Sequence, residues 1–363
     1  MALSGPPLEP SERRVVVIAG AGASTALGST GRPIPMMAGW CTLLCNSLDG
    51  EEKGIADAIG LTPQMTGWEF EQNLGSFLDV YSILPLLPRF LGLGESPVGQ
   101  RHGDVNNWHD TLQRRSSAII EALHRTLFDA FGHSAVDRVA ADRAYGSLLK
   151  ALTIGPHQVT FATTNYDPAI EIGLRSLGFE TDLGVRSPDG LAHHRLRPGD
   201  LIGEKKSGSV PVLHLHGATG WYRSGVEVMV YGPDMPYVSA LGAPAILLPD
   251  PKKTPERATA ISTIWSAFDA ALSEATHVLV IGHSLHDPYL VERLEAKFTV
   301  ASKQSLAFLN TTSLLDDRDH PAQQLLKRGT AILGDFGVES AIQDCSSGIR
   351  RWVDQTVVHL KSK

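Results

Sequence analysis

Four short segments hold the side chains that could do chemistry, and each of them follows an apolar run. They are Gly20–Thr25, Thr163–Pro168, His214–Gly217 and Gly282–Pro288. The preceding runs are short and rich in Val, Ile and Leu, which is typical of strands buried on both faces of a parallel sheet. Because open α/β sheets bind ligands at the carboxyl ends of their strands, we expect the four segments to gather around one ligand.

The first segment reads Gly20-Ala21-Gly22-Ala23-Ser24-Thr25. Glycines at a strand end let backbone N–H groups approach a pyrophosphate, and a following helix adds partial positive charge. As a dinucleotide fingerprint it is incomplete, because Thr25 occupies the third glycine position and no acidic strand end follows about 20 residues later. Taken alone, the segment is equally typical of a tight strand-to-helix turn.

The second segment places Asn165 and Asp167 two residues apart, so in extended backbone the two side chains point the same way. Asp167 could instead cap the helix that begins near Pro168, which would stabilise it by about 1 kcal/mol. Capping leaves Asn165 unexplained, so we favour a functional role for both residues.

The third segment contains His214 and His216, which at this spacing would share a strand face and could suit a metal. No carboxylate or third histidine is patterned to complete a ligand set, so we predict no metal. We interpret His214 as structural. His216 lies at the strand end beside Gly217, where an imidazole can act as a general base.

The fourth segment reads Gly282-His283-Ser284-Leu285-His286-Asp287-Pro288. A nucleophilic serine on a strand-to-helix elbow needs a glycine two positions later, where this chain has His286. Ser284 is therefore expected to contact a ligand or to cap, and Asp287-Pro288 to begin a helix.

The supporting elements predict a Rossmann-like, doubly wound parallel α/β sheet with an inserted helical module. Strands are expected at 15–19, 158–162, 210–215, 245–248, 277–281, 305–309 and 331–333, and helices at 254–275 and 288–301. Between the first two strands no strand run occurs. There a 3.6-residue apolar period predicts a helix over about 109–131, Leu84–Pro88 must interrupt any helix, and 92–104 resembles an exposed loop.

These elements suggest a tail at 1–13, a sheet domain formed by 14–35 and 151–363, and a helical insertion at 36–150. Over 363 residues the net charge is −7, which excludes a strong general attraction to nucleic acid or an anionic membrane. Three cysteines provide neither a disulfide framework nor a four-cysteine zinc site. No apolar run reaches the roughly 18 residues of a transmembrane helix. We expect a cytoplasmic protein that binds neither membrane nor nucleic acid directly.

In their order along the chain, the four segments resemble the signatures of the sirtuin-like NAD-binding family. Those signatures are Gly-Ala-Gly-x-Ser, Asn-x-Asp, Leu-His-Gly and Gly-x-Ser, which here fall on Gly20–Ser24, Asn165–Asp167, Leu215–Gly217 and Gly282–Ser284. Two weaker matches are Asn310 and Gly334-Asp335-Phe336. The resemblance covers about residues 14–345.

The chain also differs from the protein deacylases of that family at several positions. No cysteine lies between Asn165 and His216, where deacylases carry a four-cysteine zinc module. Thr164 replaces their Gln, and Arg32–Met37 lacks their Asp-Phe-Arg. Tyr166 and Asp287-Pro288 instead resemble the sirtuin-like NADase effectors of bacterial antiphage defence, which also carry a helical segment between the first two signatures.

The resemblance implies NAD⁺ as substrate, cleavage of its nicotinamide–ribose bond, and no metal. It assigns Asp167 to the nicotinamide carboxamide, Asn165 to water and ribose, and His216 to proton acceptance. It implies that the remaining positions contact the dinucleotide, with Ser284, Asn310 and Asp335 at its adenosine half: Gly20, Ala21, Gly22, Ala23, Ser24, Thr164, Gly282, Ser284, Asn310 and Asp335.

Alternatives from the same nucleotide site are a protein deacylase, an ADP-ribosyltransferase and a catalytically silent NAD or ADP-ribose sensor. The resemblance also implies gated activity, a homo-oligomer, and a companion ATPase or Argonaute-like protein. The insertion at 36–150, with Trp40, Trp68 and Trp108, is expected to serve as an assembly surface or lid, or as ordinary packing.

Overall fold

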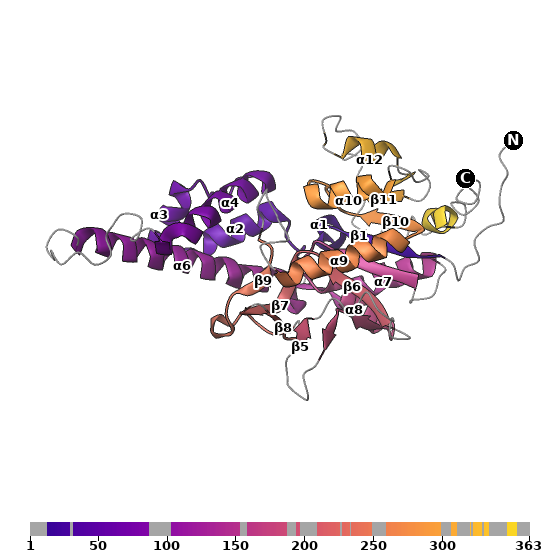
Figure 1. Ribbon diagram of the computed structural model, residues 1–363, viewed down its shortest axis with the longest axis horizontal. Coiled ribbons are helices and arrows are strands. Elements are labelled where there is room, and N and C mark those ends of the chain that lie inside the picture. Colours follow the sequence, from indigo (N-terminus) through magenta and orange to yellow (C-terminus); the bar gives the residue numbers. More distant parts are fainter. Residues whose placement is uncertain are drawn as a thin grey trace. The chain divides into compact units, whose positions relative to one another are not determined.

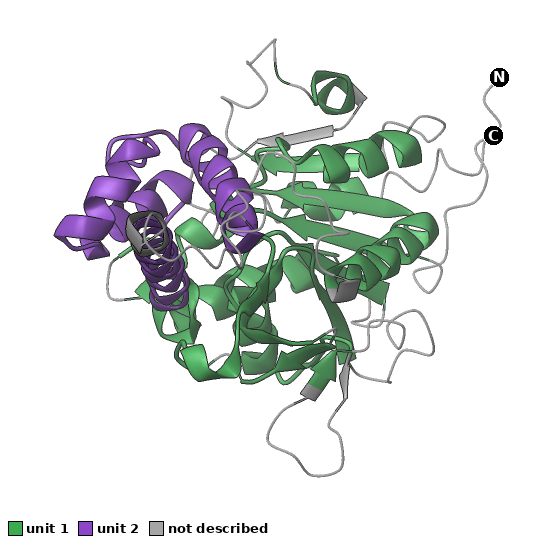
Figure 2. Ribbon diagram, turned by 60° about the vertical axis from the view of Figure 1, so that its left-hand side comes forward, with its two compact units in different colours: residues 1–34, 131–247, 254–363 green, residues 35–130, 248–253 purple. Residues whose placement is uncertain are grey.

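The computed structural model describes most of the chain. The described residues are 13–29, 32–86, 103–152, 158–186, 194–196, 209–225, 227–232, 234–248, 259–298, 306–310, 320, 322–328, 330–333 and 347–353. Two compact units emerge, the first formed by 1–34, 131–247 and 254–363 and the second by 35–130 and 248–253 (Figure 2).

The first unit is built on a seven-stranded parallel sheet in the order β12-β11-β10-β1-β2-β6-β3, of which Figure 1 labels β1, β6, β10 and β11. The strands are β1 (Val15–Ala19), β2 (Val159–Thr163), β3 (Glu180–Asp182), β6 (Ser209–His214), β10 (His277–Ile281), β11 (Leu306–Asn310) and β12 (Thr330–Leu333). This confirms the Rossmann-like α/β fold. Six of the expected strands lie within one residue of the observed ones, because uninterrupted β-branched runs mark strands that are buried on both faces.

Helices cover both faces of this sheet. Val16 and Ile18 share one buried cluster with residues of α9 (Thr259–Glu274) and α10 (Pro288–Phe298). On the other face, Phe161 of β2 packs edge-on against Tyr145 of α7 (Arg138–Leu152), and α7 packs against α8 (Ala169–Ser176). Shorter helices of this unit include α1 (Ala21–Thr25) and α12 (Gln323–Arg328).

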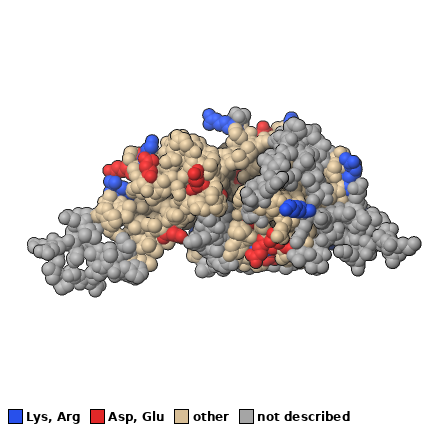
Figure 3. All heavy atoms as spheres, turned by 90° about the horizontal axis from the view of Figure 1, so that it is seen from above, with Lys and Arg blue, Asp and Glu red and all other residues tan. Residues whose placement is uncertain are grey.

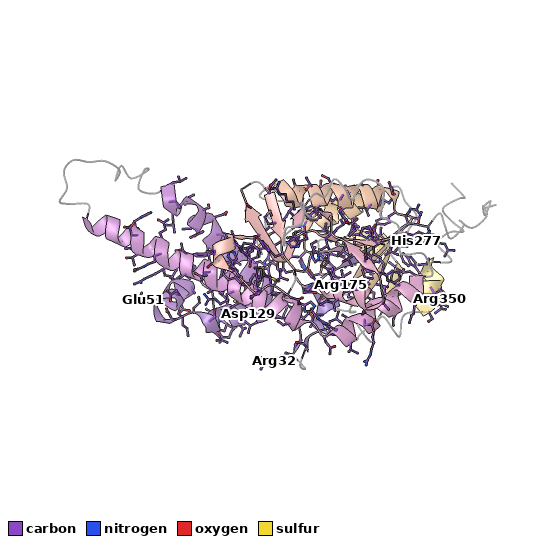
Figure 4. The ribbon with its side chains drawn as sticks, turned by 90° about the horizontal axis from the view of Figure 1, so that it is seen from below. Arg32, Glu51, Asp129, Arg175, His277 and Arg350 are labelled. Carbon is purple, nitrogen blue, oxygen red and sulfur yellow. The ribbon has the colours of Figure 1, made fainter. Side chains whose placement is uncertain are left out.

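The sheet order reverses between β1 and β10. From β1 the chain builds outward through β2 and β6 on one side, and through β10, β11 and β12 on the other. In open α/β sheets such a reversal leaves a crevice outside the carboxyl strand ends, where ligands bind. His277, labelled in Figure 4, opens β10 at its amino end, so Gly282 lies at the edge where that crevice is expected.

A second, antiparallel sheet has the order β4-β5-β8-β7-β9. Its strands are β4 (Val185–Arg186), β5 (His194–Leu196), β7 (Gly217–Ser224), β8 (Glu227–Val230) and β9 (Pro244–Ile246). The expected strand at 245–248 belongs here and not to the parallel sheet. The apolar run at 245–248 is typical of a strand that is buried on both faces, but the observed strand β9 pairs antiparallel with β7.

The second unit is helical. It holds α2 (Met37–Ser47), α3 (Gly50–Ala58), α4 (Gly67–Ile83) and most of α6 (Gly103–Phe131). Thr66 and Glu69 form a capping box at the start of α4, and Leu84–Leu86 follows its end as a 3₁₀ turn, as the Leu-Pro pattern predicts. Trp40 is buried and donates to Thr126 Oγ1, whereas Trp68 and Trp108 are exposed.

Two expectations from the sequence concern the boundaries of these units and the segments outside them. The expected insertion begins at 36, one residue after the helical unit begins at Pro35, but that unit ends at Ala130 and not at 150. α7 packs on α8 in the first unit. Most of the expected tail at 1–13 and loop at 92–104 lies outside the described residues, although 103–104 already belong to α6.

Further 3₁₀ turns lie at His133–Ala135 and Ser239–Leu241. Within the described chain, none of the helices combines the length and apolar character needed to span a bilayer.

The contact between α7 and α8 depends on Gly173. A Cβ atom added there would lie 2.5 Å from the Ala141 carbonyl oxygen, which is backbone and cannot swing away. We predict that Gly173→Ala lowers the free energy of unfolding by about 1–3 kcal/mol, the usual cost of overpacking. Urea unfolding measures the change. Gly232→Ala is the control, because a Cβ there meets nothing within 4 Å. An equal effect of both variants would contradict the packing argument.

Candidate active site

The glycine turn after β1 ties the ends of two strands together. Gly20 N donates to Ile281 O at 2.9 Å, and Gly22 N donates to Gly282 O at 2.8 Å. A Cβ at Gly20 would lie 2.5 Å from His283 Cα, and Gly282 has a φ of 56°. These positions require glycine because the two backbones approach too closely for side chains.

The same hydrogen bonds occupy N–H groups of the turn that were expected to face a diphosphate. The N–H groups of Gly20, Gly22 and Ala23 all donate to backbone carbonyls within the protein. With only five residues, α1 adds little dipole. Ala21 is the first residue of α1, and the N–H group at that position has no acceptor within the helix. The neighbouring N–H groups, in contrast, donate to backbone carbonyls.

Asn165 and Asp167 meet at the hydroxyl group of Ser24. The Asn165 amide donates to Gly20 O and to Ser24 Oγ, both at 2.9 Å, and Ser24 Oγ donates to Asp167 Oδ1 at 2.9 Å. All three residues are buried. The two-residue spacing therefore brings both side chains to one point, and Ser24 is engaged inside the protein.

The Asp167 carboxyl has a strongly altered acidity. Burial raises its pKa from 3.8 to about 6, even though hydrogen bonds from Ser24 and from Ala169 N–H act in the opposite direction. The bond from Ala169 also shows that Asp167 supports the start of α8. Burial, together with the nearby carboxylates of Asp167 and Glu171, raises the pKa of Tyr145 as well.

His214 is a fully engaged structural histidine. Its Nε2 contacts Glu171 Oε1 at 2.7 Å, and its Nδ1 contacts Asn165 O at 3.3 Å. Burial lowers its pKa, but the Glu171 charge and hydrogen bond and the Asn165 carbonyl outweigh this, so the pKa is raised overall. The pair beneath Asn165 is buried and holds the backbone of that residue.

His216 has different surroundings. Its Nε2 contacts Asp287 Oδ2 at 2.8 Å, and its ring lies 6.4 Å from the Trp265 ring of α9. The expectation that His214 and His216 share a strand face is wrong. Because β6 ends at His214, the alternation stops there, and the two rings contact helices on opposite faces of the sheet.

The register places Asn165 and His216 at one edge. Thr163 of β2 pairs with His214 of β6, and Leu215 N donates to Thr163 O at 2.8 Å. Asn165 and His216 each follow two residues after that pair, so both lie just beyond the carboxyl ends of adjacent strands. The glycine turn lies at the end of β1, which neighbours β2 on its other side.

Comparison with known families gives one match to part of the chain. Residues 159–329 match the family model of a SIR2-like domain. This stretch runs from β2 to the residue before β12, and it includes Asn165, Asp167, His216 and Asp287; the glycine turn precedes it. A SIR2-like domain implies NAD-dependent activity in general. No curated protein matches the chain.

Further positions expected to contact the dinucleotide are Thr164, Ser284, Asn310 and Asp335. Asn310 Nδ2 donates to His283 O at 2.8 Å, so the end of β11 is tied to the segment after β10. Ser284 is exposed, its carbonyl accepting from His320 Nε2 at 2.7 Å, and Thr164 N donates to Ala19 O. Asp335 lies outside the described residues.

Among the described residues, no three His, Cys, Asp or Glu side chains are grouped to hold a metal ion. On the face drawn in Figure 3, described Lys and Arg side chains are scattered among Asp and Glu and do not form one patch.

Sequence reasoning missed Glu171 and the second role of Asp287. Glu171 lies inside an amphipathic helix, where a carboxylate is expected to face solvent, and its burial gives no local signal. Asp287 is recognisable as a helix start before Pro288, but its contact with His216 spans 71 residues.

The raised pKa of Asp167 predicts a pH dependence. Because the folded state binds this proton more tightly than the unfolded chain, the carboxyl favours folding most below about pH 4, and that contribution is lost as the pH rises through about 6. At 1.36 kcal/mol per pKa unit, the loss is roughly 3 kcal/mol. Asp167→Asn should remove this loss from urea-unfolding free energies measured between pH 4 and 7.

The raised pKa of His214 acts in the same direction but is present in both proteins, so it largely cancels in the difference. Asp269→Asn, at an exposed carboxylate paired with Arg293, is the matched control and should keep the wild-type pH profile. An Asp167→Asn profile that parallels wild type would contradict the assignment.

Proposed function

We propose that this chain is an NAD⁺ glycohydrolase, which cleaves the nicotinamide–ribose bond to give nicotinamide and ADP-ribose. The observation that carries the proposal is that Asn165 and His216 both lie just beyond the ends of adjacent strands, within the stretch that matches a SIR2-like domain. The chemistry suits this set of residues. Nicotinamide leaves as a neutral amine while positive charge develops on the ribose carbon, so no acid is needed at the leaving group.

Asn165 is suited to orient the attacking water or a ribose hydroxyl. Both donors of its amide are used, one by Gly20 O and one by Ser24 Oγ, so the side chain is held in one orientation. Its Oδ1 accepts no hydrogen bond from the described residues. The amide therefore presents a fixed acceptor, which is the requirement for positioning a nucleophile.

His216 is suited to accept the proton. Both ring nitrogens of His214 have partners, whereas Nδ1 of His216 makes no hydrogen bond within the described part of the chain. In the proposed reaction the water oxygen bonds to the ribose carbon, the carbon–nitrogen bond breaks with its electron pair going to nicotinamide, and the water proton goes to His216.

The binding roles follow the resemblance, with one refinement. Asp167 accepts from the nicotinamide carboxamide through its second carboxyl oxygen, since Oδ1 already accepts from Ser24 and Ala169. In the glycine turn, the Ala21 N–H is the group assigned to the diphosphate, because its neighbours donate elsewhere. Ser284, Asn310 and Asp335 are assigned to the adenosine half.

Asn165→Ala and His216→Ala should each lower NAD⁺ turnover on the order of 10²-fold or more, because each removes a group that acts in the transition state. Nicotinamide release is measured by chromatography and ADP-ribose by mass spectrometry. Glu274→Ala, at an exposed position at the end of α9 in the first unit, is the control and should keep full activity.

Three outcomes would contradict this proposal. Near-wild-type turnover in either variant would remove the assigned roles. O-acetyl-ADP-ribose formed only with an acetylated peptide present would indicate a deacylase. NAD⁺ binding by the wild-type chain without nicotinamide release, alone and with its gene neighbours, would indicate a sensor.

The proposal includes gating, because uncontrolled cleavage would exhaust the coenzyme of the host cell. The resemblance to antiphage-defence effectors supports a role of that class, in which assembly controls activity. Trp68 and Trp108 of the helical unit are about half exposed, at 51% and 57%, and Trp68 lines a surface hollow with Met65 and Gln72. We propose this unit as the assembly surface.

The assembly proposal predicts that Trp68→Ala and Trp108→Ala shift the mass measured by size-exclusion chromatography with light scattering toward the monomer. Large apolar side chains at a surface favour association, so the loss of either indole ring should weaken it. A wild-type chain that is monomeric at all concentrations would contradict it.

A further inference from the structure

Asp287 contacts His216 from the first turn of α10. Asp287 Oδ2 lies 2.8 Å from His216 Nε2, and both side chains are about 95% buried or more. In a buried pair of this kind each polar group needs a partner, since an unpaired one carries a large desolvation cost. The contact joins the end of β6 to the segment after β10, which are otherwise separated by β1 and β2 in the sheet.

The carboxylate is held rigidly. Asp287 Oδ1 accepts from Tyr289 N at 2.9 Å and from Leu290 N at 3.2 Å, so the residue is the N-cap of α10 and Pro288 its first helical residue. Helix N-terminal N–H groups also favour a negative charge at this position.

The turn before Asp287 stores backbone strain. Leu285 has a φ of 55°, in the left-handed region that a branched side chain rarely adopts, yet it is fully buried and its N–H donates to His283 Nδ1 at 2.8 Å. Strained residues of this kind persist only where the surroundings hold them, and they concentrate at functional sites. Here the turn aims Asp287 at His216.

We propose that Asp287 is the positioning residue that sets the tautomer of His216, a role that rests on the proposed function of His216 as proton acceptor. A carboxylate can only accept, so the proton of the neutral imidazole must sit on Nε2. Nδ1 then carries the lone pair, and it is the nitrogen without a hydrogen bond in the described chain. When Nδ1 takes a proton, the adjacent carboxylate stabilises the imidazolium.

The Asp287→Asn variant isolates this role from the capping role. Asn ranks with Asp as an N-cap, and its Oδ1 can still accept from Tyr289 and Leu290. Its NH₂ group then faces His216 Nε2, which must become the acceptor, so the proton moves to Nδ1. The opposite amide orientation would point NH₂ at two backbone N–H donors and is disfavoured.

The direct test measures the tautomer in the free protein. With ¹⁵N-labelled histidine, and with His216→Gln to assign the signal, nitrogen shifts distinguish the Nε2–H from the Nδ1–H form. We expect Nε2–H in wild type and Nδ1–H in Asp287→Asn, with thermal unfolding little changed. The same tautomer in both proteins, or Nδ1–H in wild type, would overturn the proposal whether or not the chain cleaves NAD⁺.

The kinetic test separates positioning from folding. Asp287→Asn should lower kcat on the order of 10²-fold or more while NAD⁺ affinity stays near wild type, because only proton transfer is affected. Asp287→Ser keeps a good N-cap without the contact, and should lose activity together with the single tautomer. Asp269→Asn on α9 should leave turnover unchanged. An active Asp287→Asn enzyme would overturn the role of Asp287, whereas an inactive wild type with the expected tautomers would contradict only the proposed function.

Discussion

The whole arrangement depends on the close approach of two backbones where β1 and β10 end. Gly20 and Gly22 bond to the carbonyls of Ile281 and Gly282, and a side chain at any of the three glycines would collide with the facing main chain. Strands diverge from each other at this reversal of sheet order. The glycine contacts fix where the divergence begins, and so they set the distance between the segments that follow each strand.

Near the strand ends, the buried polar side chains form hydrogen bonds with one another. Ser24 links Asn165 to Asp167, and the His214–Glu171 pair supports the Asn165 carbonyl. Burying such groups costs free energy that a well-packed apolar cluster would not cost. The structure retains them where they hold an amide and a carboxyl in one orientation, which is consistent with a site that requires precise geometry.

The sequence predicted the parallel sheet well because its strands are covered on both faces and appear as continuous apolar runs. It did not predict the antiparallel sheet, since strands as short as Val185–Arg186 give no periodicity. The alternation rule also failed at His216, because the strand ends at His214 and the chain turns at Gly217, with a φ of 79°. The partners Glu171 and Asp287 are set by tertiary packing, which spacing along the chain does not encode.

The central strand has a consequence for how the molecule is made. Val15 pairs with both Val159 and His277, and its pairing with His277 spans more than half of the polypeptide. Contacts this distant carry a high loop-closure entropy and are formed slowly during folding. During synthesis, β1 gains its second neighbour only after most of the chain has been made, and a product truncated before β10 would lack the contact between the ends of β1 and β10.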